Sequence, residues 1–211
     1  MEEKKLEEYI LNHIEQEEPV LSELNRETHL KVLGARMLSG HLQGQVLTML
    51  SKIIQPTVIL EVGTFTGYSA ICLARGLKED GKLITLEIDD ELASFAARYF
   101  EKAGLKGKIV QRIGPALNII PELDETLDLV FLDADKKEYI DYYELVLGKL
   151  RKGGIVIVDN TLWSGKVLEQ PAPGDDQTRG IIEFNEMIKN DARVEKVILP
   201  VRDGMTVIRK K

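Results

Sequence analysis

The stretch Val58-Ile59-Leu60-Glu61-Val62-Gly63-Thr64-Phe65-Thr66-Gly67-Tyr68-Ser69, followed directly by the helical run Ala70–Leu77, decides the fold. A short β-branched run that passes through a glycine turn into a helix is typical of a nucleotide-binding α/β sheet. The glycine spacing matches neither a dinucleotide fingerprint nor a P-loop. Gly63 and Gly67 still let the backbone approach a ligand closely, and Ser69 can present its hydroxyl to a carboxylate at the helix start. The turn therefore favours an adenosyl ligand that carries a carboxylate.

The rest of the chain alternates short β-branched runs with longer helical stretches, as a parallel sheet with crossover helices requires. Near the C-terminus, Asp203-Gly204 separates two further β-rich runs and indicates a hairpin. The sheet is therefore expected to finish with an antiparallel pair at an edge. The predicted strands are Val58–Val62, Leu83–Glu87, Ile109–Arg112, Leu127–Leu132, Ile155–Val158, Val194–Pro200 and Met205–Arg209.

Two segments lie outside this alternation. Residues 1–50 read as N-terminal helices, with breaks near Glu18-Pro19 and near Leu38-Ser39-Gly40. Residues 164–180 are rich in Gly, Pro and Asp, and we expect them to form a substrate loop or lid. Because no repeat, low-complexity segment or linker interrupts the chain, residues 1–211 are predicted to form a single domain.

Composition narrows the partners and the compartment. The net charge of −7 gives no general attraction to phosphate backbones, so a small substrate is favoured over nucleic acid. Cys72 is the only cysteine, which excludes an intramolecular disulfide, and its apolar neighbours indicate a packed core thiol. The N-terminus has no apolar segment of the secretory type, and no run approaches membrane-spanning length. We therefore expect a cytoplasmic protein without a membrane partner.

The end of the second predicted strand, Leu86-Glu87-Ile88-Asp89-Asp90, carries acidic residues. Glu87 is placed to accept hydrogen bonds from both hydroxyls of a ribose, and Ile88 can pack on an adenine face. An ordinary strand followed by an Asp helix cap is the alternative for this segment alone. Joined to the glycine turn, the ribose interpretation is favoured.

Two other predicted strands also end in oxygen-bearing side chains. Asp133 follows the strand that ends at Leu132, and Asp159 and Asn160 follow the strand that ends at Val158. The carboxyl ends of neighbouring parallel strands border one crevice, so these three side chains can converge. An oxygen ligand set without cysteine or histidine favours Mg²⁺, Mn²⁺ or Ca²⁺ over zinc. An Asp at a strand end is more often a helix cap, and only the combination indicates a metal site.

Lys136 lies three residues after Asp133. A lysine beside a cation in a dry cleft has its charged form disfavoured, which makes it a candidate general base towards an acceptor hydroxyl. A solvated surface lysine is the alternative. Trp163 and the loop after it are candidates for an aromatic wall and a lid, although a core tryptophan explains the residue nearly as well.

Several segments together resemble the cation-dependent O-methyltransferases, the group of caffeoyl-CoA and catechol O-methyltransferases and their bacterial relatives. The resemblance runs from Met37 to Arg209 and is carried by Glu61–Ser69, Gly114-Pro115-Ala116, Phe131–Lys136, Asp159–Trp163 and Leu199–Thr206. It implies a Rossmann-like, S-adenosylmethionine-dependent methyltransferase fold, with a seven-stranded, mostly parallel sheet whose last strand is antiparallel. Homodimers are common in that family, and we expect one here.

The resemblance also implies a role for each matching residue. Asp133 would be a metal ligand and catalytic residue close to the cofactor, and Lys136 the catalytic base. The metal ligands would be Asp133, Asp159 and Asn160. The cofactor-binding residues would be Glu61, Gly63, Thr64 and Ser69 at the methionine end, Glu87 and Ile88 at the ribose and adenine, Ala116 at the adenine edge, and Ser39, Asp133 and Asp135 elsewhere along the cofactor.

The expected activity is therefore methyl transfer from S-adenosylmethionine to a hydroxyl of a small catechol-like or hydroxycinnamoyl-type aromatic, with a divalent cation. Ser164 stands where plant relatives carry a substrate-contacting Asn, which leaves the CoA ester open. One alternative is a tRNA hydroxyuridine O-methyltransferase, for which Arg151-Lys152 and Lys210-Lys211 could supply a basic patch. The other is a non-catalytic binding module or a nicotinamide oxidoreductase, which the missing third glycine and the acidic cluster disfavour.

Overall fold

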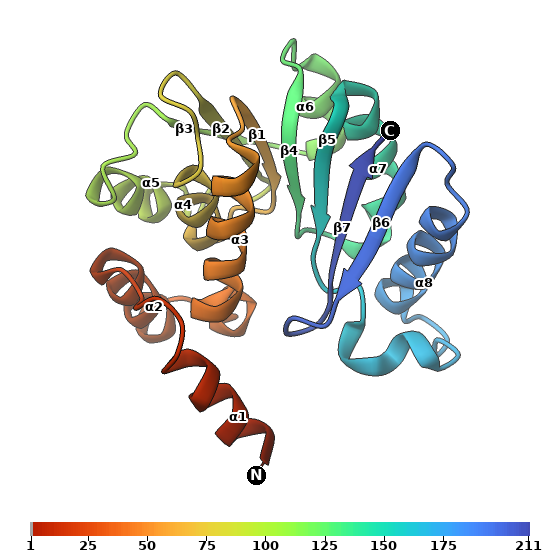
Figure 1. The fold of residues 1–211 in the computed structure, drawn as a ribbon, viewed down its shortest axis with the longest axis horizontal. Helices are drawn as coiled ribbons and strands as arrows, with labels where there is room; N and C mark the ends of the chain where they lie inside the picture. Colours follow the sequence, from red (N-terminus) through yellow and green to blue (C-terminus); the bar gives the residue numbers. More distant parts are fainter. Residues whose placement is uncertain (1) are drawn as a thin grey trace.

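The computed structural model describes residues 2–211, with side chains from Lys5 onward, and contains one seven-stranded sheet in the order β3-β2-β1-β4-β5-β7-β6 (Figure 1). Six strands run in one direction, and β7 is antiparallel to both of its neighbours. The predicted fold class is confirmed. The strands are Val58–Val62 (β1), Lys82–Glu87 (β2), Ile109–Ile113 (β3), Leu127–Leu132 (β4), Leu150–Val158 (β5), Val194–Leu199 (β6) and Met205–Lys210 (β7).

The sequence left the order within the final antiparallel pair open. β7 lies between β5 and β6, so β6 is the edge strand. One strand boundary differs from the expectation. β5 begins at Leu150, five residues earlier than predicted, because Leu150 pairs with Leu127 across a register shift in β4. Polar and glycine residues follow Leu150, so a search for apolar runs did not include this part of the strand.

The N-terminal helices form as predicted, with breaks at Pro19 and before Gly40. A further break at Val32–Gly34, which the helical pattern did not reveal, precedes a short 3₁₀ turn. The α-helices are α1 (Glu2–Leu11), α2 (Pro19–Lys31), α3 (Gly40–Ile54), α4 (Tyr68–Ala74), α5 (Ala93–Lys102), α6 (Ala116–Glu122), α7 (Tyr139–Lys149) and α8 (Asp176–Lys189), and the 3₁₀ segments are η1 (Ala35–Met37), η2 (Lys136–Glu138) and η3 (Trp163–Leu168).

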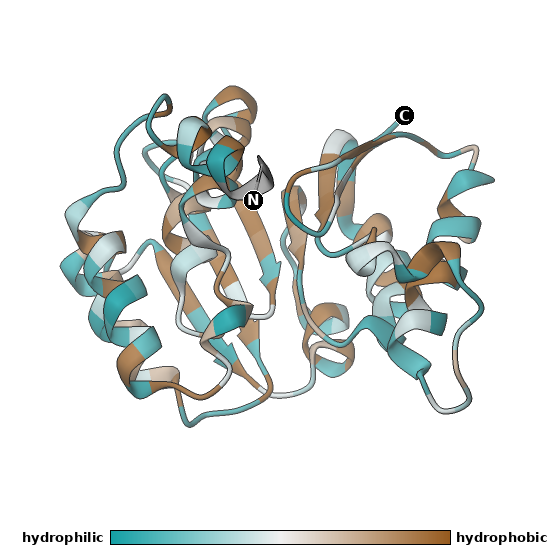
Figure 2. Ribbon diagram, turned by 90° about the horizontal axis from the view of Figure 1, so that it is seen from below, coloured by the Kyte–Doolittle hydropathy of each residue, from teal (hydrophilic) through white to brown (hydrophobic). Residues whose placement is uncertain are grey.

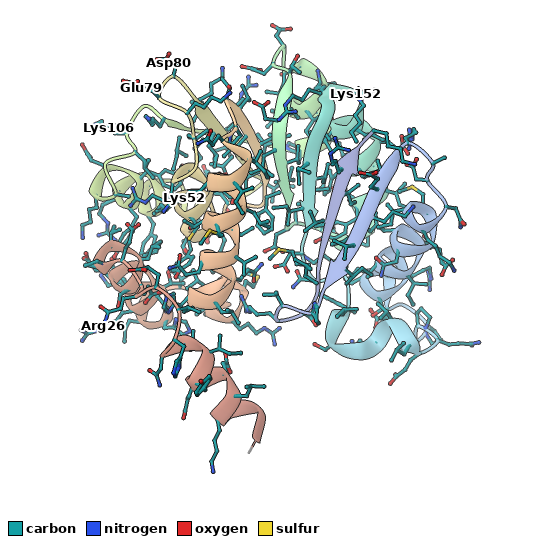
Figure 3. All side chains as sticks on the ribbon, in the orientation of Figure 1. Arg26, Lys52, Glu79, Asp80, Lys106 and Lys152 are labelled. Carbon is teal, nitrogen blue, oxygen red and sulfur yellow. The ribbon has the colours of Figure 1, made fainter. Side chains whose placement is uncertain are left out.

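Successive side chains of each strand point to opposite faces of the sheet, which divides the core into two layers. Leu60 and Val130 face α6, α7 and α8, whereas Ile59 and Phe131 face α2, α3, α4 and α5. Figure 2 shows apolar strands between helices whose outer sides are hydrophilic. The charged side chains labelled in Figure 3 lie at the periphery of the molecule. Cys72 is buried on α4, and burial raises the pKa of its thiol to about 12, as expected for a core thiol.

The segment expected to be a substrate loop over residues 164–180 is shorter than predicted. α8 already begins at Asp176, because Asp175 caps it by accepting a hydrogen bond from the Thr178 backbone N–H at 3.2 Å. Thr178 and Gly180 are therefore buried helix residues and not loop residues. Among residues 2–211, we find no helix with the length and apolar character needed to span a bilayer.

Candidate active site

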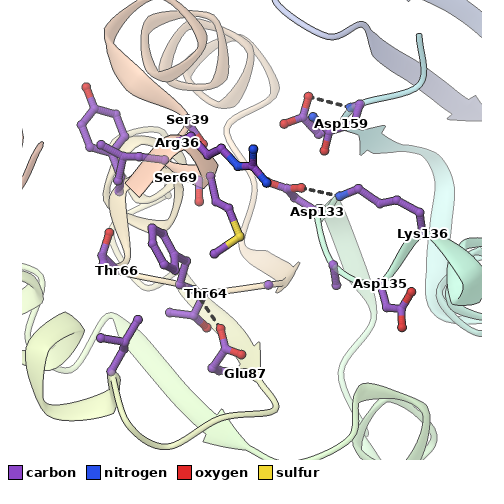
Figure 4. A pocket seen from close by; sticks show the side chains of 18 of the residues that line it. Arg36, Ser39, Thr64, Thr66, Ser69, Glu87, Asp133, Asp135, Lys136 and Asp159 are labelled. Carbon is purple, nitrogen blue, oxygen red and sulfur yellow. Dashed lines mark hydrogen bonds and ion pairs between the residues drawn. The ribbon is translucent and has the colours of Figure 1, made fainter. Parts of the chain in front are cut away.

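One large cleft, of about 1430 Å³, opens at the carboxyl ends of the parallel strands (Figure 4). Its walls come from the turns after β1, β2, β4 and β5, from the segment before α3, and from the β6–β7 turn. Ligand pockets in proteins commonly occupy about 300–1,000 Å³, so the cleft has room for a cofactor together with an acceptor.

The turn after β1 requires glycine for a reason beyond ligand access. Gly63 has a φ of 103°, and a Cβ built on it would lie 2.0 Å from the carbonyl oxygen of Asp133. The missing side chain therefore lets the ends of β1 and β4 approach each other. This close approach places the first turn and Asp133 on the same wall of the cleft.

Glu61 lies behind this turn and is fully buried, so it is not among the residues that line the cleft. Its Oε2 accepts a hydrogen bond from the Thr85 hydroxyl at 2.6 Å, and Thr85 also contacts the Thr64 hydroxyl at 2.5 Å. Within the described part of the chain no hydrogen bond forms to its Oε1, and burial, which outweighs the nearby Ser69 hydroxyl, raises the pKa of the carboxyl to about 8. A buried, unpaired carboxylate oxygen is costly unless a ligand donates to it.

Glu87 lies at the end of β2, as predicted, and is held by the backbone. The N–H of Phe65 donates to its Oε2 at 2.8 Å, and the N–H of Ile88 donates to its Oε1 at 2.9 Å. Ile88 lies on the cleft wall with 73% of its surface exposed, so the described residues leave this apolar side chain largely uncovered. Both features fit a ribose and a base bound along this wall.

The other predicted cofactor residues divide into two groups. Ser39, Thr64, Ser69 and Asp135 line the cleft. Ala116 is buried at the start of α6 and is not a lining residue, so the structure does not bring its side chain to the cleft.

Asp133, Asp159 and Asn160 all line the cleft, although 26 residues separate the two acids. Figure 4 shows the side chains of Asp133 and Asp159 on the same wall. Asn160 adopts a left-handed conformation (φ 59°), and its N–H donates to Oδ1 of Asp159 at 2.8 Å. Within the described part of the chain, no three His, Cys, Asp or Glu side chains gather as a metal site. The cluster offers two carboxylates and one amide.

Burial and like charge act together on Asp159. Its side chain is 3% exposed, and burial, together with the negative charge of Asp133, raises the pKa of its carboxyl to about 6. No ion pair to Asp159 forms among the side chains from Lys5 onward. The two carboxylates and the Asn160 amide are oxygen donors of the kind that hard divalent ions prefer.

Lys136 is buried, in contrast to an ordinary surface lysine. Its Nζ lies 2.8 Å from Oδ1 of Asp133 and 5.1 Å from the centre of the Tyr139 ring. Its backbone N–H donates to Oε1 of Gln177 at 3.0 Å, which anchors the segment to α8. The lysine is thus fixed beside the acidic cluster.

Comparison with known proteins identifies the family. The model of a family described as O-methyltransferase matches residues 11–211. The chain belongs to the O-methyltransferase family. This confirms the resemblance inferred from the sequence.

Curated relatives of this O-methyltransferase include caffeoyl-CoA O-methyltransferase 1 of Arabidopsis thaliana, which is 38% identical over 80% of this chain and 69% of its own length. Caffeoyl-CoA O-methyltransferase 5 of Nicotiana tabacum is 37% identical over 80% of this chain and 75% of its own length.

Solved structures agree with this assignment. The O-methyltransferase TomG of Streptomyces achromogenes, solved in complex with S-adenosylmethionine, has a TM-score of 0.90 and 31% identity, and covers 98% of this chain and 96% of its own. An O-methyltransferase of Bacillus cereus, solved with S-adenosylhomocysteine, has a TM-score of 0.88 and 30% identity, and covers 98% and 97% of the two chains.

Sequence reasoning missed two residues that line the cleft of this O-methyltransferase and one buried residue behind it. Arg36 lines the cleft from η1, and Arg202 lines it from the β6–β7 turn. Gln43 on α3 is buried and reaches Asp159 with a hydrogen bond of 2.7 Å. A signal was present for Gln43, because it falls four residues before Leu47 and eight before Ser51 on the buried face of α3.

Trp163, the predicted aromatic wall, lines the cleft from a strained segment. Trp163 and Ser164 have φ values of 46° and 51°, in the left-handed region. The indole Nε1 donates to the Thr178 hydroxyl at 3.0 Å, so the ring is fixed against α8. It is a cleft residue and not a core tryptophan.

The basic pairs considered for tRNA binding lie away from the cleft. Arg151 and Lys152 are near the start of β5, and Lys210 ends β7, which is antiparallel and therefore finishes at the same end of the sheet. Arg151 pairs with Asp128, and the Lys210 ammonium donates to backbone carbonyls at 2.7 Å. Neither pair forms a basic surface around the site.

Proposed function

We propose that this chain transfers the methyl group of S-adenosylmethionine to a hydroxyl of a small catechol-like or hydroxycinnamoyl-type aromatic, with a divalent cation held by Asp133, Asp159 and Asn160. The observation that carries this proposal is the arrangement of two acidic side chains. Asp159 is buried beside Asp133, and no ion pair to Asp159 forms among the side chains from Lys5 onward. Mg²⁺ is the favoured ion, and Mn²⁺ or Ca²⁺ could take the same oxygen ligands.

The cofactor assignment is supported by two acidic groups beside the first turn, Glu61 on β1 and Glu87 at the end of β2, which accepts from the Phe65 N–H of that turn. The unpartnered Oε1 of Glu61 is suited to the ammonium group of the methionine end, and Glu87 is suited to the ribose. Gly63, Thr64 and Ser69 lie between them. The complexes of TomG with S-adenosylmethionine and of the Bacillus cereus enzyme with S-adenosylhomocysteine support the same ligand class.

A divalent cation, when bound, would lower the pKa of a coordinated acceptor hydroxyl and fix its position. The Lys136 ammonium donates to Oδ1 of Asp133 at 2.8 Å, so its Nζ lies beside the residues that would hold the cation. In its neutral form, Lys136 can take the proton from the acceptor hydroxyl as general base.

The methyl transfer itself is a displacement at carbon. The acceptor oxygen, without its proton, forms a bond to the methyl carbon, and the bond from that carbon to sulfur breaks with its electron pair retained by sulfur. The products are a methyl ether, S-adenosylhomocysteine and protonated Lys136. The chain contributes by holding the oxygen and the methyl carbon at roughly 3 Å in a site from which water is excluded.

Two adjacent hydroxyls can both bind one cation, which is why a catechol-like acceptor is favoured. Trp163 supplies an aromatic wall on the acceptor side of the cleft. The curated relatives are named caffeoyl-CoA O-methyltransferases, which supports an aromatic acceptor. Ser164 stands where the plant relatives carry a substrate-contacting Asn, so the free aromatic is preferred over its CoA ester.

The experiment is a methyl-transfer assay with labelled S-adenosylmethionine and four acceptors: a catechol, a hydroxycinnamoyl ester, a flavonoid and undermodified tRNA. Each is tested with EDTA and after addition of Mg²⁺. Label in the catechol or the hydroxycinnamoyl ester that is lost with EDTA and restored by Mg²⁺ is the expected result. Transfer to tRNA alone, or turnover that survives exhaustive chelation, would overturn the proposal.

A further inference from the structure

Gln43 connects the N-terminal helices to the acidic cluster. It lies in the first turn of α3, is 1% exposed, and donates from Nε2 to Oδ2 of Asp159 at 2.7 Å. The two residues are 116 positions apart in the sequence. A buried amide with a carboxylate partner makes a hydrogen bond that is stronger than one between neutral groups.

Arg202 determines which way the Gln43 amide points. Its Nη1 donates to Oε1 of Gln43 at 3.0 Å and to the carbonyl oxygen of Leu38 at 2.9 Å, and it also contacts the carbonyl of Ser39. Arginine can only donate hydrogen bonds, so it must face the amide oxygen. The amide nitrogen is thereby left to face Asp159, and the opposite orientation is excluded by both partners.

Close packing keeps Gln43 in this place. A Cβ on its neighbour Gly44 would lie 2.7 Å from the Tyr68 ring and 2.9 Å from the sulfur of Cys72. α3 therefore lies against α4 at a distance that only glycine allows. The backbone of Gln43 has little freedom to move relative to the first turn of the cofactor wall.

The carboxylate of Asp159 is held at both oxygens. Gln43 donates to Oδ2, and the backbone N–H of Asn160 donates to Oδ1 at 2.8 Å. Each oxygen accepts one hydrogen bond here and keeps a further lone pair. The plane of the carboxylate is fixed while both oxygens can still bind a cation.

We propose that Gln43 is a positioning residue, which, oriented by Arg202, holds Asp159 in the geometry that receives a divalent cation together with Asp133. This inference rests on the proposed function. It makes the metal site depend on three distant parts of the chain: α3, the turn after β5 and the β6–β7 turn. Removal of a partner that orients a metal ligand commonly costs about 10- to 100-fold in metal affinity.

The test compares Gln43→Leu with Gln45→Leu on the same helix. Gln45 is half-buried and donates to the backbone of Glu15, outside the cleft. Binding of Mn²⁺ is measured by electron paramagnetic resonance, and binding of S-adenosylhomocysteine by calorimetry without metal. We expect Gln43→Leu to weaken Mn²⁺ binding about tenfold or more, with S-adenosylhomocysteine affinity within twofold of wild type, and Gln45→Leu to change neither.

Arg202→Met provides a second variant that leaves the Gln43 side chain in place. It should weaken Mn²⁺ binding less than Gln43→Leu, because the amide keeps its contact to Asp159 but loses its fixed orientation. If Gln43→Leu does not fold, wild-type Mn²⁺ affinity in Arg202→Met overturns the inference.

Failure of the inference and failure of the proposed function are distinguishable. Wild-type Mn²⁺ affinity in Gln43→Leu, together with loss of binding in Asp159→Ala, overturns the positioning role alone. Absence of Mn²⁺ binding to the wild-type protein overturns the metal-dependent function, and the positioning role with it.

Discussion

The carbonyl oxygen of Asp133 occupies the space that a side chain on Gly63 would need, 2.0 Å from the position of its Cβ. Gly63→Ala would force β1 and β4 apart and would place alanine at a φ of 103°. We expect the free energy of unfolding to fall by about 3 kcal/mol or more, with loss of S-adenosylhomocysteine binding. Urea denaturation and calorimetry measure the two effects.

Gly165→Ala is the matched control for that substitution. Gly165 also has a positive φ, of 80°, but a Cβ there meets open space. It should cost about 1 kcal/mol, from the left-handed conformation alone. If the free energy of unfolding falls equally in both variants, the close approach to Asp133 is not the reason that glycine is needed at position 63.

Burial of Glu61 makes the stability of the ligand-free protein depend on pH. The pKa of this carboxyl rises from 4.5 in the unfolded chain to about 8 in the fold. The folded state therefore binds its proton more tightly, so this contribution to stability is complete below pH 4.5 and is lost as the pH rises through 8. Glu61→Gln removes the titration.

The ligand-free Gln variant should therefore gain stability relative to wild type between pH 5 and 8. The gain is at most about 1.4 kcal/mol for each pH unit, and thermal unfolding across this range measures it. Binding of S-adenosylhomocysteine should become weaker in the same variant, because the ammonium loses an anionic partner. A constant difference between the two proteins at all pH values would contradict the assignment.

The sequence was sufficient for most of the sheet because its central strands are buried on both faces. Val58–Val62 and Leu127–Leu132 are apolar except for Glu61 and Asp128, and both strands begin and end where predicted. The insertion of β7 between β5 and β6 depends on tertiary packing that a hairpin signal does not encode. The site was predictable where strand ends carry acids, as at Asp133 and Glu87.

The contact between Gln43 and Asp159 was not predictable in the same way, because a polar residue on a helix normally faces solvent. Its place on the buried face of α3 was the available signal. Ala116 was assigned through the family resemblance alone, and the structure keeps its side chain away from the cleft. The homodimer and the cytoplasmic location stay predictions.

Arg36 lines the cleft, where Figure 4 shows its side chain, and no ion pair of Arg36 forms among the side chains from Lys5 onward. An unpaired guanidinium on the wall favours an acceptor that carries a carboxylate. Arg36→Met should raise KM for a carboxylated catechol about tenfold, equivalent to about 1.4 kcal/mol, and change KM for unsubstituted catechol less than twofold.

Steady-state kinetics with the two acceptors gives the comparison. Lys31→Met is the control, because Lys31 also lines the cleft but is paired with Glu27 at 2.5 Å. An equal effect on both acceptors in Arg36→Met would assign the residue to general packing of the cleft.

Thr178 holds the strained segment that carries Trp163. It is 2% exposed, accepts from the indole Nε1 at 3.0 Å, and donates to Oδ2 of Asp175 at 2.7 Å. Thr178→Val keeps the shape but leaves the indole N–H without its partner, which should lower the free energy of unfolding by roughly 1–2 kcal/mol. If Trp163 forms the acceptor wall, as in the proposed function, acceptor KM should rise while S-adenosylhomocysteine affinity stays unchanged.

Thr28→Val separates this effect from loss of a buried hydroxyl in general. Thr28 is fully buried on α2, and its hydroxyl has no hydrogen-bond partner among the residues that the structure describes. Replacement of an unpaired buried hydroxyl by a methyl group should be neutral or stabilising. Chemical denaturation of both variants, with acceptor kinetics for each, measures the contrast. Equal destabilisation of the two proteins would show that the bond to Trp163 contributes nothing of its own.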